Sequence, residues 1–202
     1  MAKPVQIGQR RVQTGHFKVP LSGPVEIGEA GVPSDFIGNH KHHGGPDQAI
    51  YLFGLDDMGW WGSMLRREIA PGLFGENLTI SHWWPDPRVG DRLRCGSLLL
   101  ELTGPRTPCA TLEASLGVRG LSQAFVKAER CGAYARVLSP GTLHVGDTLV
   151  VERADSAFPT ITQVFRYWHG RGDDRAFLSA ALAAPLACRI AHKFQERLAR
   201  LD

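Results

Sequence analysis

The sequence lacks the features that would place it outside the class of ordinary globular proteins. Its four cysteines, Cys95, Cys109, Cys131 and Cys188, form no Cys-x-x-Cys pair, which argues against a zinc ribbon and against a thioredoxin-like redox site. The first residues, MAKPVQIGQRR, contain no apolar run typical of a signal peptide. No uninterrupted apolar stretch approaches the roughly 20 residues that a membrane span requires. We therefore expect a cytoplasmic protein with reduced thiols and no membrane partner.

A strong charge of one sign is also missing. The formal net charge is +3 at pH 7, and the basic residues are scattered along the chain without forming a long run. This distribution argues against a nucleic-acid partner. The 202 residues are 43% hydrophobic and 21% charged, which is ordinary for a folded protein that buries a core without a disulfide or a structural metal.

The first three quarters of the sequence indicate a β-rich domain. From Pro4 to about Leu149 the chain is dense in glycine and proline, with short apolar or alternating runs between them. Such runs, bounded by turn residues, predict the strands of a sandwich or barrel. The predicted strands include 77–81, 97–103, 134–138 and 148–152, with Gly-Asp turns ahead of two strands at 90–91 and 146–147. Helices are expected at 55–67, capped by Asp56 and Asp57, and at 121–129, capped by Ser122.

The last quarter of the sequence differs and predicts three short helices. Pro159 and Thr160 open the first, which runs to about Tyr167; residues 175–184 are rich in alanine; Pro185 is placed to start the third, since proline is tolerated in a first helical turn. The third helix carries one apolar stripe with a spacing of four residues, made of Leu186, Ile190, Phe194 and Leu198.

Three histidines within four residues, His40, His42 and His43, precede Gly44 and Gly45. The pattern is compatible with a loop whose backbone and imidazoles face one ligand. It is equally compatible with a solvated surface loop, because histidine clusters also occur without a ligand. A zinc site is less well supported, since the spacing leaves the remaining ligands unidentified.

Cys109 follows a predicted strand and comes directly after Pro108, ahead of a predicted short helix. A thiol near a helix N-terminus with Arg106 nearby ionises more readily than a free one, and a thiolate binds soft transition metals. From the residues alone, the simpler interpretation of Cys109 as a small buried apolar side chain is favoured. Glu76 and Asn77 offer polar groups just before another strand, where Asn77 can equally serve as a turn residue.

Taken in order, several segments resemble the MOSC domain of the YiiM-like family. They are TGHFKVP at 14–20, HHGGPDQAIY at 42–51, PGLFGENLTI at 71–80, VGDRLRCGSLLLELTGPRTPC at 89–109 and GAYARVLSPGTLHVGD at 132–147. The resemblance covers nearly the whole chain and extends to the helical tail. It implies a mainly β fold with helices, in which a MOSC β-barrel domain over residues 1–153 is followed by a three-helix C-terminal unit over residues 154–202.

The resemblance also implies a molybdenum cofactor (Mo-molybdopterin) at the mouth of the barrel, with the Cys109 thiolate on the metal. A candidate for proton delivery is His43, because an unperturbed imidazole titrates near neutrality. One departure from the family pattern is Gln48, which stands where a basic residue is common and puts one phosphate or pterin contact in doubt. The residues that match the family's motifs and are implied to hold the pterin and its phosphate are Lys18, His43, Gly44, Gly45, Asn77 and Arg106.

Relatives of this kind, including the mitochondrial amidoxime-reducing component, reduce N-hydroxylated compounds. The resemblance therefore implies a molybdenum cofactor-dependent oxidoreductase for N-hydroxylated purines, amidoximes or similar substrates, a detoxification reaction. Nothing in the sequence resembles a flavin or iron–sulfur site, so electrons are expected from a separate reductase. Two alternatives stay open: a non-catalytic carrier of the cofactor, and a sulfur carrier that uses a Cys109 persulfide. A homodimer is a further expectation, and pyridoxal phosphate binding is not expected.

Overall fold

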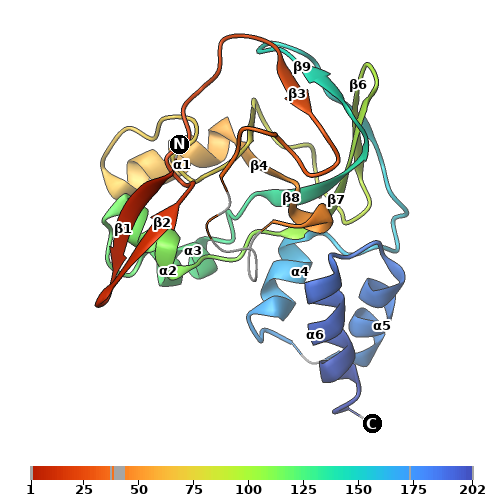
Figure 1. Ribbon diagram of the computed structural model, residues 1–202. Coiled ribbons are helices and arrows are strands. Elements are labelled where there is room, and N and C mark those ends of the chain that lie inside the picture. Colours follow the sequence, from red (N-terminus) through yellow and green to blue (C-terminus); the bar gives the residue numbers. More distant parts are fainter. Residues whose placement is uncertain (1, 37, 39–43, 173, 202) are drawn as a thin grey trace.

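The computed structural model describes residues 2–36, 38, 44–172 and 174–201. Its centre is a curled six-stranded sheet with the strand order β10-β6-β7-β8-β4-β5 (Figure 1). Neighbouring strands are antiparallel except for β4 and β5, which run parallel. The strands of this sheet are β4 (Ile50–Gly54), β5 (Leu78–Ile80), β6 (Arg92–Cys95), β7 (Leu98–Pro105), β8 (Ala133–Ser139) and β10 (Val150–Glu152).

Two smaller antiparallel pairs flank the main sheet. One consists of β1 (Lys3–Ile7) and β2 (Arg10–Thr14), and the other of β3 (Val25–Ile27) and β9 (Gly141–Leu143). The remaining elements in the described part of the chain are a short 3-10 helix η1 (Pro46–Gln48) and the helices α1 (Leu55–Leu65), α2 (Ala110–Leu116), α3 (Leu121–Ala128), α4 (Ile161–Trp168), α5 (Arg175–Ala183) and α6 (Cys188–Leu198).

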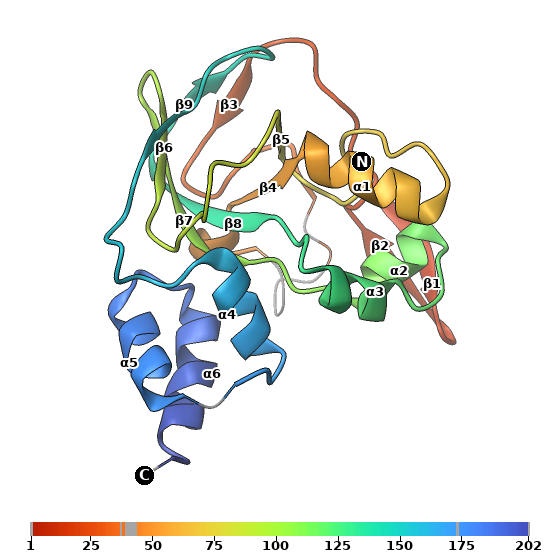
Figure 2. The same cartoon turned by 180° about the vertical axis from the view of Figure 1, so that it is seen from behind.

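The helices form two groups on different sides of the sheet. In both views α1, α2 and α3 lie together near the β1–β2 hairpin, and α4, α5 and α6 form a separate cluster at the C-terminal end (Figures 1 and 2). A sheet-centred domain is thus combined with helices, and the predicted mainly β fold with helices is confirmed. None of the helices among the described residues has an apolar stretch long enough to span a bilayer.

A continuous hydrophobic core fills the space between these elements. Every residue of β4 is buried, as is most of β7. Aromatic rings stack within the core, with centroids 4.6 Å apart for Phe53 and Phe74 and 5.2 Å apart for Trp61 and Phe125. The same core continues into the helical tail through residues such as Phe194, which is fully buried. The predicted apolar stripe of the last helix is therefore confirmed as a packing surface.

The expected helix caps were wrong at two places. Helix α1 has Gly54 as its N-cap and no side-chain cap, and Asp57 instead pairs with Arg130 at 2.6 Å. Ser122 does not cap α3; the Glu113 carboxylate accepts hydrogen bonds from the backbone N–H groups of Gly120 and Ser122, at 3.0 and 3.1 Å. The Glu113 carboxylate, on the preceding helix, thus supplies the capping acceptor that was expected from the Ser122 hydroxyl. This contact depends on the tertiary structure.

The third tail helix also begins later than predicted, at Cys188 and not at Pro185. Ala187, just before the helix, has extended backbone angles of φ −56° and ψ 134°, because its donor binds another strand. The Ala187 N–H donates to the Thr103 carbonyl of β7 at 2.9 Å, and the Cys188 N–H donates to the Asp47 carboxylate at 2.7 Å. The first helix begins as predicted, with Thr160 as N-cap in a capping box with Gln163.

Asp91 lies in the turn before β6 and hydrogen-bonds to the segment that leads into the helical tail. It is fully buried, and its carboxylate accepts hydrogen bonds from the Trp84 indole at 2.7 Å, the Arg88 backbone at 2.9 Å and the Ala154 backbone at 2.7 Å. Because a buried carboxylate is costly without partners, these donors are what make its burial possible.

We expect Asp91→Ala to lower the free energy of unfolding by about 3 kcal/mol or more, because it leaves several buried donors without an acceptor. Asp91→Asn should cost less, since one side-chain oxygen remains to accept. Urea denaturation followed by fluorescence measures both, with Glu68→Ala at an exposed position as the control. A loss for Asp91→Ala no larger than that of the control would contradict this role.

An ion-pair cluster between the end of α3 and α4 makes the free energy of unfolding depend on pH. Glu129 pairs with Arg166 of α4 at 2.7 Å and with Arg171 at 2.8 Å. The hydrogen bond from Arg166, helped by the charges of both arginines, lowers the pKa of the Glu129 carboxyl below its ordinary value of 4.5. A carboxyl with a lowered folded-state pKa stabilises the fold above its ordinary pKa, and this stabilisation is lost as the pH falls.

Glu129→Gln should therefore lower the free energy of unfolding at pH 7 by about 1 kcal/mol, since the arginine partners are partly exposed. The difference from the wild type should shrink as the pH is lowered through and below the ordinary glutamate pKa. Urea denaturation at a series of pH values measures this. A difference that stays constant from pH 7 to pH 3 would show that the ionised carboxylate is not the cause.

Candidate functional site

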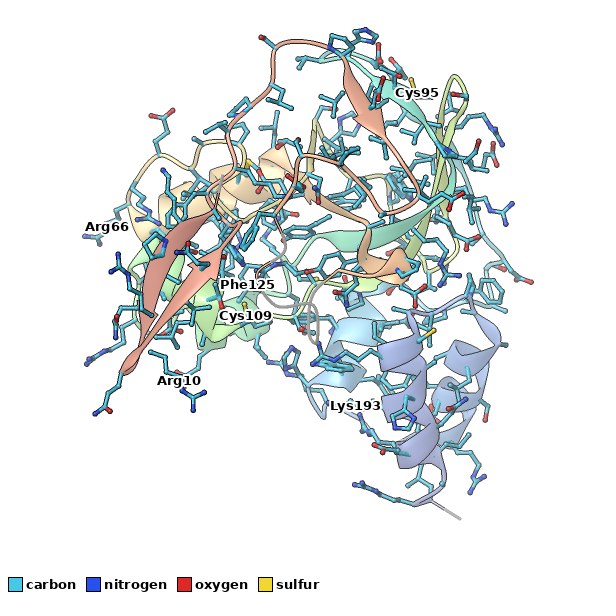
Figure 3. All side chains as sticks on the ribbon, viewed as in Figure 1. Arg10, Arg66, Cys95, Cys109, Phe125 and Lys193 are labelled. Atoms are coloured by element: carbon cyan, nitrogen blue, oxygen red, sulfur yellow. The ribbon has the colours of Figure 1, made fainter. Side chains whose placement is uncertain are left out.

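Cys109 lies where β7 gives way to α2. It is the N-cap residue of that helix, with extended backbone angles of φ −136° and ψ 161°, so the predicted position ahead of a short helix is confirmed. Its side chain is half-buried, whereas Cys131 is buried and Cys188 is exposed. Figure 3 shows that Cys109 and Cys95 lie far apart, toward opposite ends of the sheet domain. Burial raises the pKa of the Cys131 thiol far above its usual value, so Cys131 is not a candidate for thiolate chemistry.

Arg106 is buried behind Cys109, with only 2% of its surface exposed. Its guanidinium carbon lies 5.3 Å from the centre of the Tyr51 ring and 5.8 Å from that of Phe125. Burial acts to lower the pKa of Arg106, but electrostatic attraction to Tyr51, Tyr134 and Cys109 outweighs it, and the pKa lies above its usual value. The site therefore holds a permanent positive charge next to the thiol.

One nitrogen of this guanidinium lacks a hydrogen-bond partner within the described ranges of the chain. Nη1 of Arg106 is buried and makes no hydrogen bond to any described residue. Buried polar groups in folded proteins are nearly always hydrogen-bonded, so an open donor on a buried arginine indicates a place for a ligand atom or an ordered water.

Two tyrosines hold Arg106 in place. The rings of Tyr51 and Tyr134 lie 5.3 Å apart, and the Tyr51 hydroxyl donates to the Cys131 carbonyl at 3.0 Å. Burial raises the pKa of both phenols, and Arg106 acts in the opposite direction. Both tyrosines are therefore neutral near pH 7. They supply ring faces and hydroxyl groups to the cation.

Lys18 and Asn77 were predicted as cofactor-binding residues, and both contact the same carboxylate, that of Asp35. The Lys18 ammonium pairs with Asp35 at 2.5 Å, and the Asn77 side-chain amide donates to the same carboxylate oxygen. Asn77 also accepts from the Tyr51 backbone N–H at 2.9 Å, and its own N–H donates to the Tyr51 carbonyl at 2.8 Å. The Lys18–Asp35–Asn77 network is thus joined through Tyr51 to Arg106.

The glycine pair at the start of η1 adopts a conformation that suits glycine. Gly44 and Gly45 have φ angles of +80° and +81°, in the region that other residues rarely occupy. A Cβ atom on Gly45 would meet nothing within 4 Å, so its backbone faces open space. His43, predicted for proton delivery and cofactor binding, lies outside the described residues, as do His40 and His42.

Glu76, by contrast, has a structural role. It is 3% exposed, and its carboxylate accepts hydrogen bonds from the backbone of Gly72 and Phe74 and from the Thr79 hydroxyl. These contacts close the loop that carries Asn77. Glu76 therefore positions its neighbour, and its carboxylate oxygens are already engaged within the loop.

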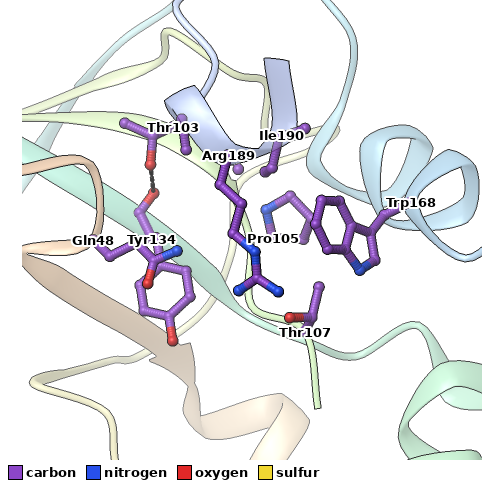
Figure 4. A pocket seen from close by; sticks show the side chains of 10 residues that line it. Gln48, Thr103, Pro105, Thr107, Tyr134, Trp168, Arg189 and Ile190 are labelled. Atoms are coloured by element: carbon purple, nitrogen blue, oxygen red, sulfur yellow. Dashed lines mark hydrogen bonds between the residues drawn. The ribbon is translucent and has the colours of Figure 1, made fainter. Parts of the chain in front are cut away.

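A pocket lined in part by Tyr134 opens between the sheet and the helical tail (Figure 4). We call it the seam pocket. The sheet side contributes Gln48, Pro105, Thr107 and Tyr134, and the tail contributes Trp168, Ala187, Arg189 and Ile190. Because Thr107 precedes Cys109 by two residues, one wall of the seam pocket continues directly into the cysteine segment.

The structure thus brings Arg106, Cys109 and Tyr134 into direct interaction and ties Lys18 to Asn77. Sequence reasoning missed Asp35 and Tyr51. Tyr51 ends the HHGGPDQAIY segment, so its position in a motif was a usable signal. No sequence signal pointed to Asp35, because it lies in a loop between motifs and only its contacts in the folded structure identify it.

We expect Arg106→Met to leave the free energy of unfolding unchanged or to raise it by about 1 kcal/mol, because a buried charge is replaced by an apolar side chain of similar length. Arg106→Ala should lower it by about 2 kcal/mol or more through the cavity that it creates. Urea denaturation of both variants in the absence of any cofactor tests this. A large loss for Arg106→Met would show that the guanidinium stabilises the fold instead of serving a ligand.

Known proteins are similar to this chain over most of its length. Protein YiiM of Escherichia coli is 25% identical over 185 residues, which cover 89% of this chain and 82% of that protein. The uncharacterised protein YflK of Bacillus subtilis is 28% identical over 141 residues, 69% of this chain and 64% of YflK. A protein of Gibberella moniliformis named "Reductase" is 29% identical over 142 residues, but the match spans only 24% of its length.

Among solved structures, YiiM from Geobacillus stearothermophilus superimposes with a TM-score of 0.80 at 27% identity, covering 98% of this chain and 95% of that one. The model of the MOSC domain family matches residues 39–150. This range, more than half of the chain, includes Gly44, Gly45, Asn77, Arg106 and Cys109. The chain belongs to the MOSC domain family.

Proposed function

We propose that this protein is a molybdenum cofactor-dependent reductase of N-hydroxylated compounds, with Cys109 as the protein ligand of molybdenum. The observation that carries the proposal is the pairing of a half-buried thiol with a fully buried arginine whose Nη1 has no partner among the described residues. Such a pair offers one anionic metal ligand and one fixed cation in a place shielded from water.

The chemistry of the donor set fits this cofactor. No group of three or more histidine, cysteine or acidic side chains that could hold a metal is found within the described ranges. Molybdopterin brings its own sulfur ligands to the metal and needs only one more from the protein, which Cys109 can provide. Its pterin and phosphate need hydrogen-bond donors and cations, and Arg106 and Lys18 are both at hand.

Each residue of the site has a distinct task in this proposal. Cys109 binds the metal, and Arg106 stabilises the thiolate and donates Nη1–H to the cofactor. Lys18 and Asn77, held by Asp35, bind the pterin side. The exposed backbone of Gly44 and Gly45 allows a ligand to approach closely. His43, from the sequence, delivers protons.

When bound, the cofactor supplies the two-electron chemistry that removes oxygen from an N–OH group. In the balanced reaction the N–O bond breaks, an N–H bond forms and water leaves, which consumes two electrons and two protons. A separate reductase supplies the electrons. The aromatic rings around Arg106 keep water away from the charged pair and so strengthen its interactions.

The comparisons support a reductase through the name of one relative only, the Gibberella moniliformis protein. That match covers a small part of the relative, so its activity can reside in other domains. The geometry of Cys109 and Arg106 in this chain is therefore the stronger support.

Cys109→Ser should abolish molybdenum binding, because a hydroxyl is a far weaker ligand for this metal than a thiolate. The wild type, produced in a host that makes the cofactor, should retain about one molybdenum and one pterin per chain. It should also reduce an N-hydroxylated purine with a chemical electron donor, and Cys109→Ser should not. Metal analysis, pterin fluorescence and product chromatography give the three readouts.

Cys95→Ser is the matched control, since Cys95 is also half-buried but lies on β6, and it should behave as the wild type. Metal without turnover would identify a carrier of the cofactor instead of a reductase. A persulfide on Cys109 without metal would identify a sulfur carrier. Absence of metal from the wild type in a host shown to supply it would refute the proposal.

A further inference from the structure

Five exposed cations lie around helix α2, whose N-cap residue is Cys109. They come from three separate parts of the chain and are Lys3, Arg10, Arg66, Arg67 and Arg119. None of the five forms an ion pair with another residue in the described ranges of the chain. We call this set the basic face. The chemistry proposed for Cys109 makes no use of it.

The β1–β2 hairpin contributes Lys3 and Arg10 to the basic face. Strand β1 packs against α2, and the side chains of a strand alternate between its two faces. In the hairpin register Arg10 lies opposite Ile7. Lys3, Arg10 and the buried Val5 therefore share one face of the hairpin, the face turned toward α2.

The other three cations follow helices. Arg66 and Arg67 come directly after α1, and Arg119 lies in the turn after α2. The Arg67 guanidinium donates to the Leu116 carbonyl at 3.1 Å, which holds the end of α1 against the end of α2. Figure 3 shows Arg66 and Arg10 at the same end of the molecule, away from the helical tail. The basic face thus surrounds one short helix.

Three carboxylates on the same helices are already engaged. Asp57 of α1 pairs with Arg130 at 2.6 Å. Glu113 of α2 accepts hydrogen bonds from the backbone at the start of α3, and these bonds, helped by the charge of Arg119, hold the pKa of its carboxyl below the ordinary value. Glu129, at the end of α3, pairs with two arginines of the tail segment. The basic face therefore keeps a surplus of positive charge.

Several cations elsewhere on the molecule are paired. Arg92 contacts Glu101 at 3.0 Å, and Arg94 contacts Glu152 at 2.6 Å. The formal net charge of the whole chain is only +3, so the surplus at the basic face is a local feature. A local surplus of one sign attracts partners of the opposite sign and orients them before contact.

Exposed apolar side chains adjoin the basic face on α1. Met64, just before Arg66, is 57% exposed, and Trp60 is 37% exposed. They are four residues apart and so lie on one side of the helix. Tryptophan, methionine and arginine are enriched at interfaces between proteins. Their combination here favours a protein partner that carries both acidic and apolar groups.

We propose that the basic face docks the electron donor of the reaction, a redox protein with an acidic surface. This inference rests on the proposed reductase function, which requires two electrons from a separate protein. Helix α2 spans seven residues from its start at Cys109, about 10 Å. A protein that covers the basic face therefore comes near the cysteine, and its opposite charge speeds the encounter.

Flavodoxin, an acidic flavin protein, is the probe for such a donor. Two molecules of fully reduced flavodoxin each give up one electron. With two protons, these electrons break the N–O bond of the substrate, form an N–H bond and release water. The reaction is balanced without any further reagent.

Binding of flavodoxin to the cofactor-free protein tests the surface without turnover. Isothermal titration calorimetry should give a Kd that rises about tenfold between about 20 and about 200 mM sodium chloride. Arg10→Glu and Arg66→Glu, on two separate elements, should each weaken binding about fivefold or more. Arg200→Glu, at an exposed position of the tail, is the matched control and should have no effect. Urea denaturation checks that the variants remain folded.

Turnover of the cofactor-loaded protein with two donors links the surface to the reaction. Reduced methyl viologen is a small molecule that needs no docking surface, whereas reduced flavodoxin does. Arg10→Glu and Arg66→Glu should raise KM for flavodoxin about fivefold or more and leave kcat with methyl viologen unchanged. Arg200→Glu should match the wild type with both donors.

The docking surface would be overturned if flavodoxin failed to bind at low salt, or if all three variants bound it equally well. Tighter binding of a DNA duplex or of phosphatidylglycerol vesicles than of flavodoxin would also overturn it, and would assign the basic face to a polyanion. Turnover with methyl viologen would in each case leave the proposed function intact. Salt-dependent binding at the basic face without turnover by either donor would instead support the surface and refute the reductase.

Discussion

A guanidinium buried among aromatic rings governs the functional end of this molecule. Arg106 is almost completely shielded from water, yet it stays charged, so the surrounding residues must compensate for the lost solvation. Tyr51 and Phe125 offer ring faces to it, and Tyr134 and Cys109 interact with it electrostatically. Through these contacts residues of β4, β8 and α3 meet around one cation next to the cysteine. Nη1 has no hydrogen-bond partner within the part of the chain that the structure describes, so a ligand atom or an ordered water can complete the arrangement.

The attachment of the helical tail is the second constraint, and it acts through close backbone contacts. A Cβ atom on Gly104 of β7 would lie 2.4 Å from the tip of the Ile190 side chain of α6, so the glycine lets α6 pack closely against the strand. The Asp47 carboxylate pairs with Arg136 at 2.9 Å and accepts the first N–H of α6. Asp47 follows Gly44 and Gly45 in the chain. Its contacts therefore hold this loop, the sheet and the helical tail together beside the seam pocket.

Much of the fold was accessible from residue patterns, because those patterns reflect local physics. Short apolar runs between turn residues identified β7, β8 and β10 with errors of a few residues, and Thr160 marked the start of α4 through its capping chemistry. The errors came where distant groups replaced local ones. Glu113 caps α3 in place of Ser122, and contacts with Thr103 and Asp47 delay the start of α6. Such contacts join positions far apart in the chain and leave no periodic signal.

By itself, the sequence determined the family and the mainly β architecture, and its ordered motifs selected Cys109, Arg106, Lys18 and Asn77 as candidate site residues. Only the tertiary structure decided that Asp35 joins Lys18 to Asn77, that Tyr51 supports Arg106 and that Arg189 faces Thr107 across the seam pocket. The physical reason is that charge pairing and burial depend on distance in space. For residues far apart in the sequence, that distance is set only when the whole chain is folded.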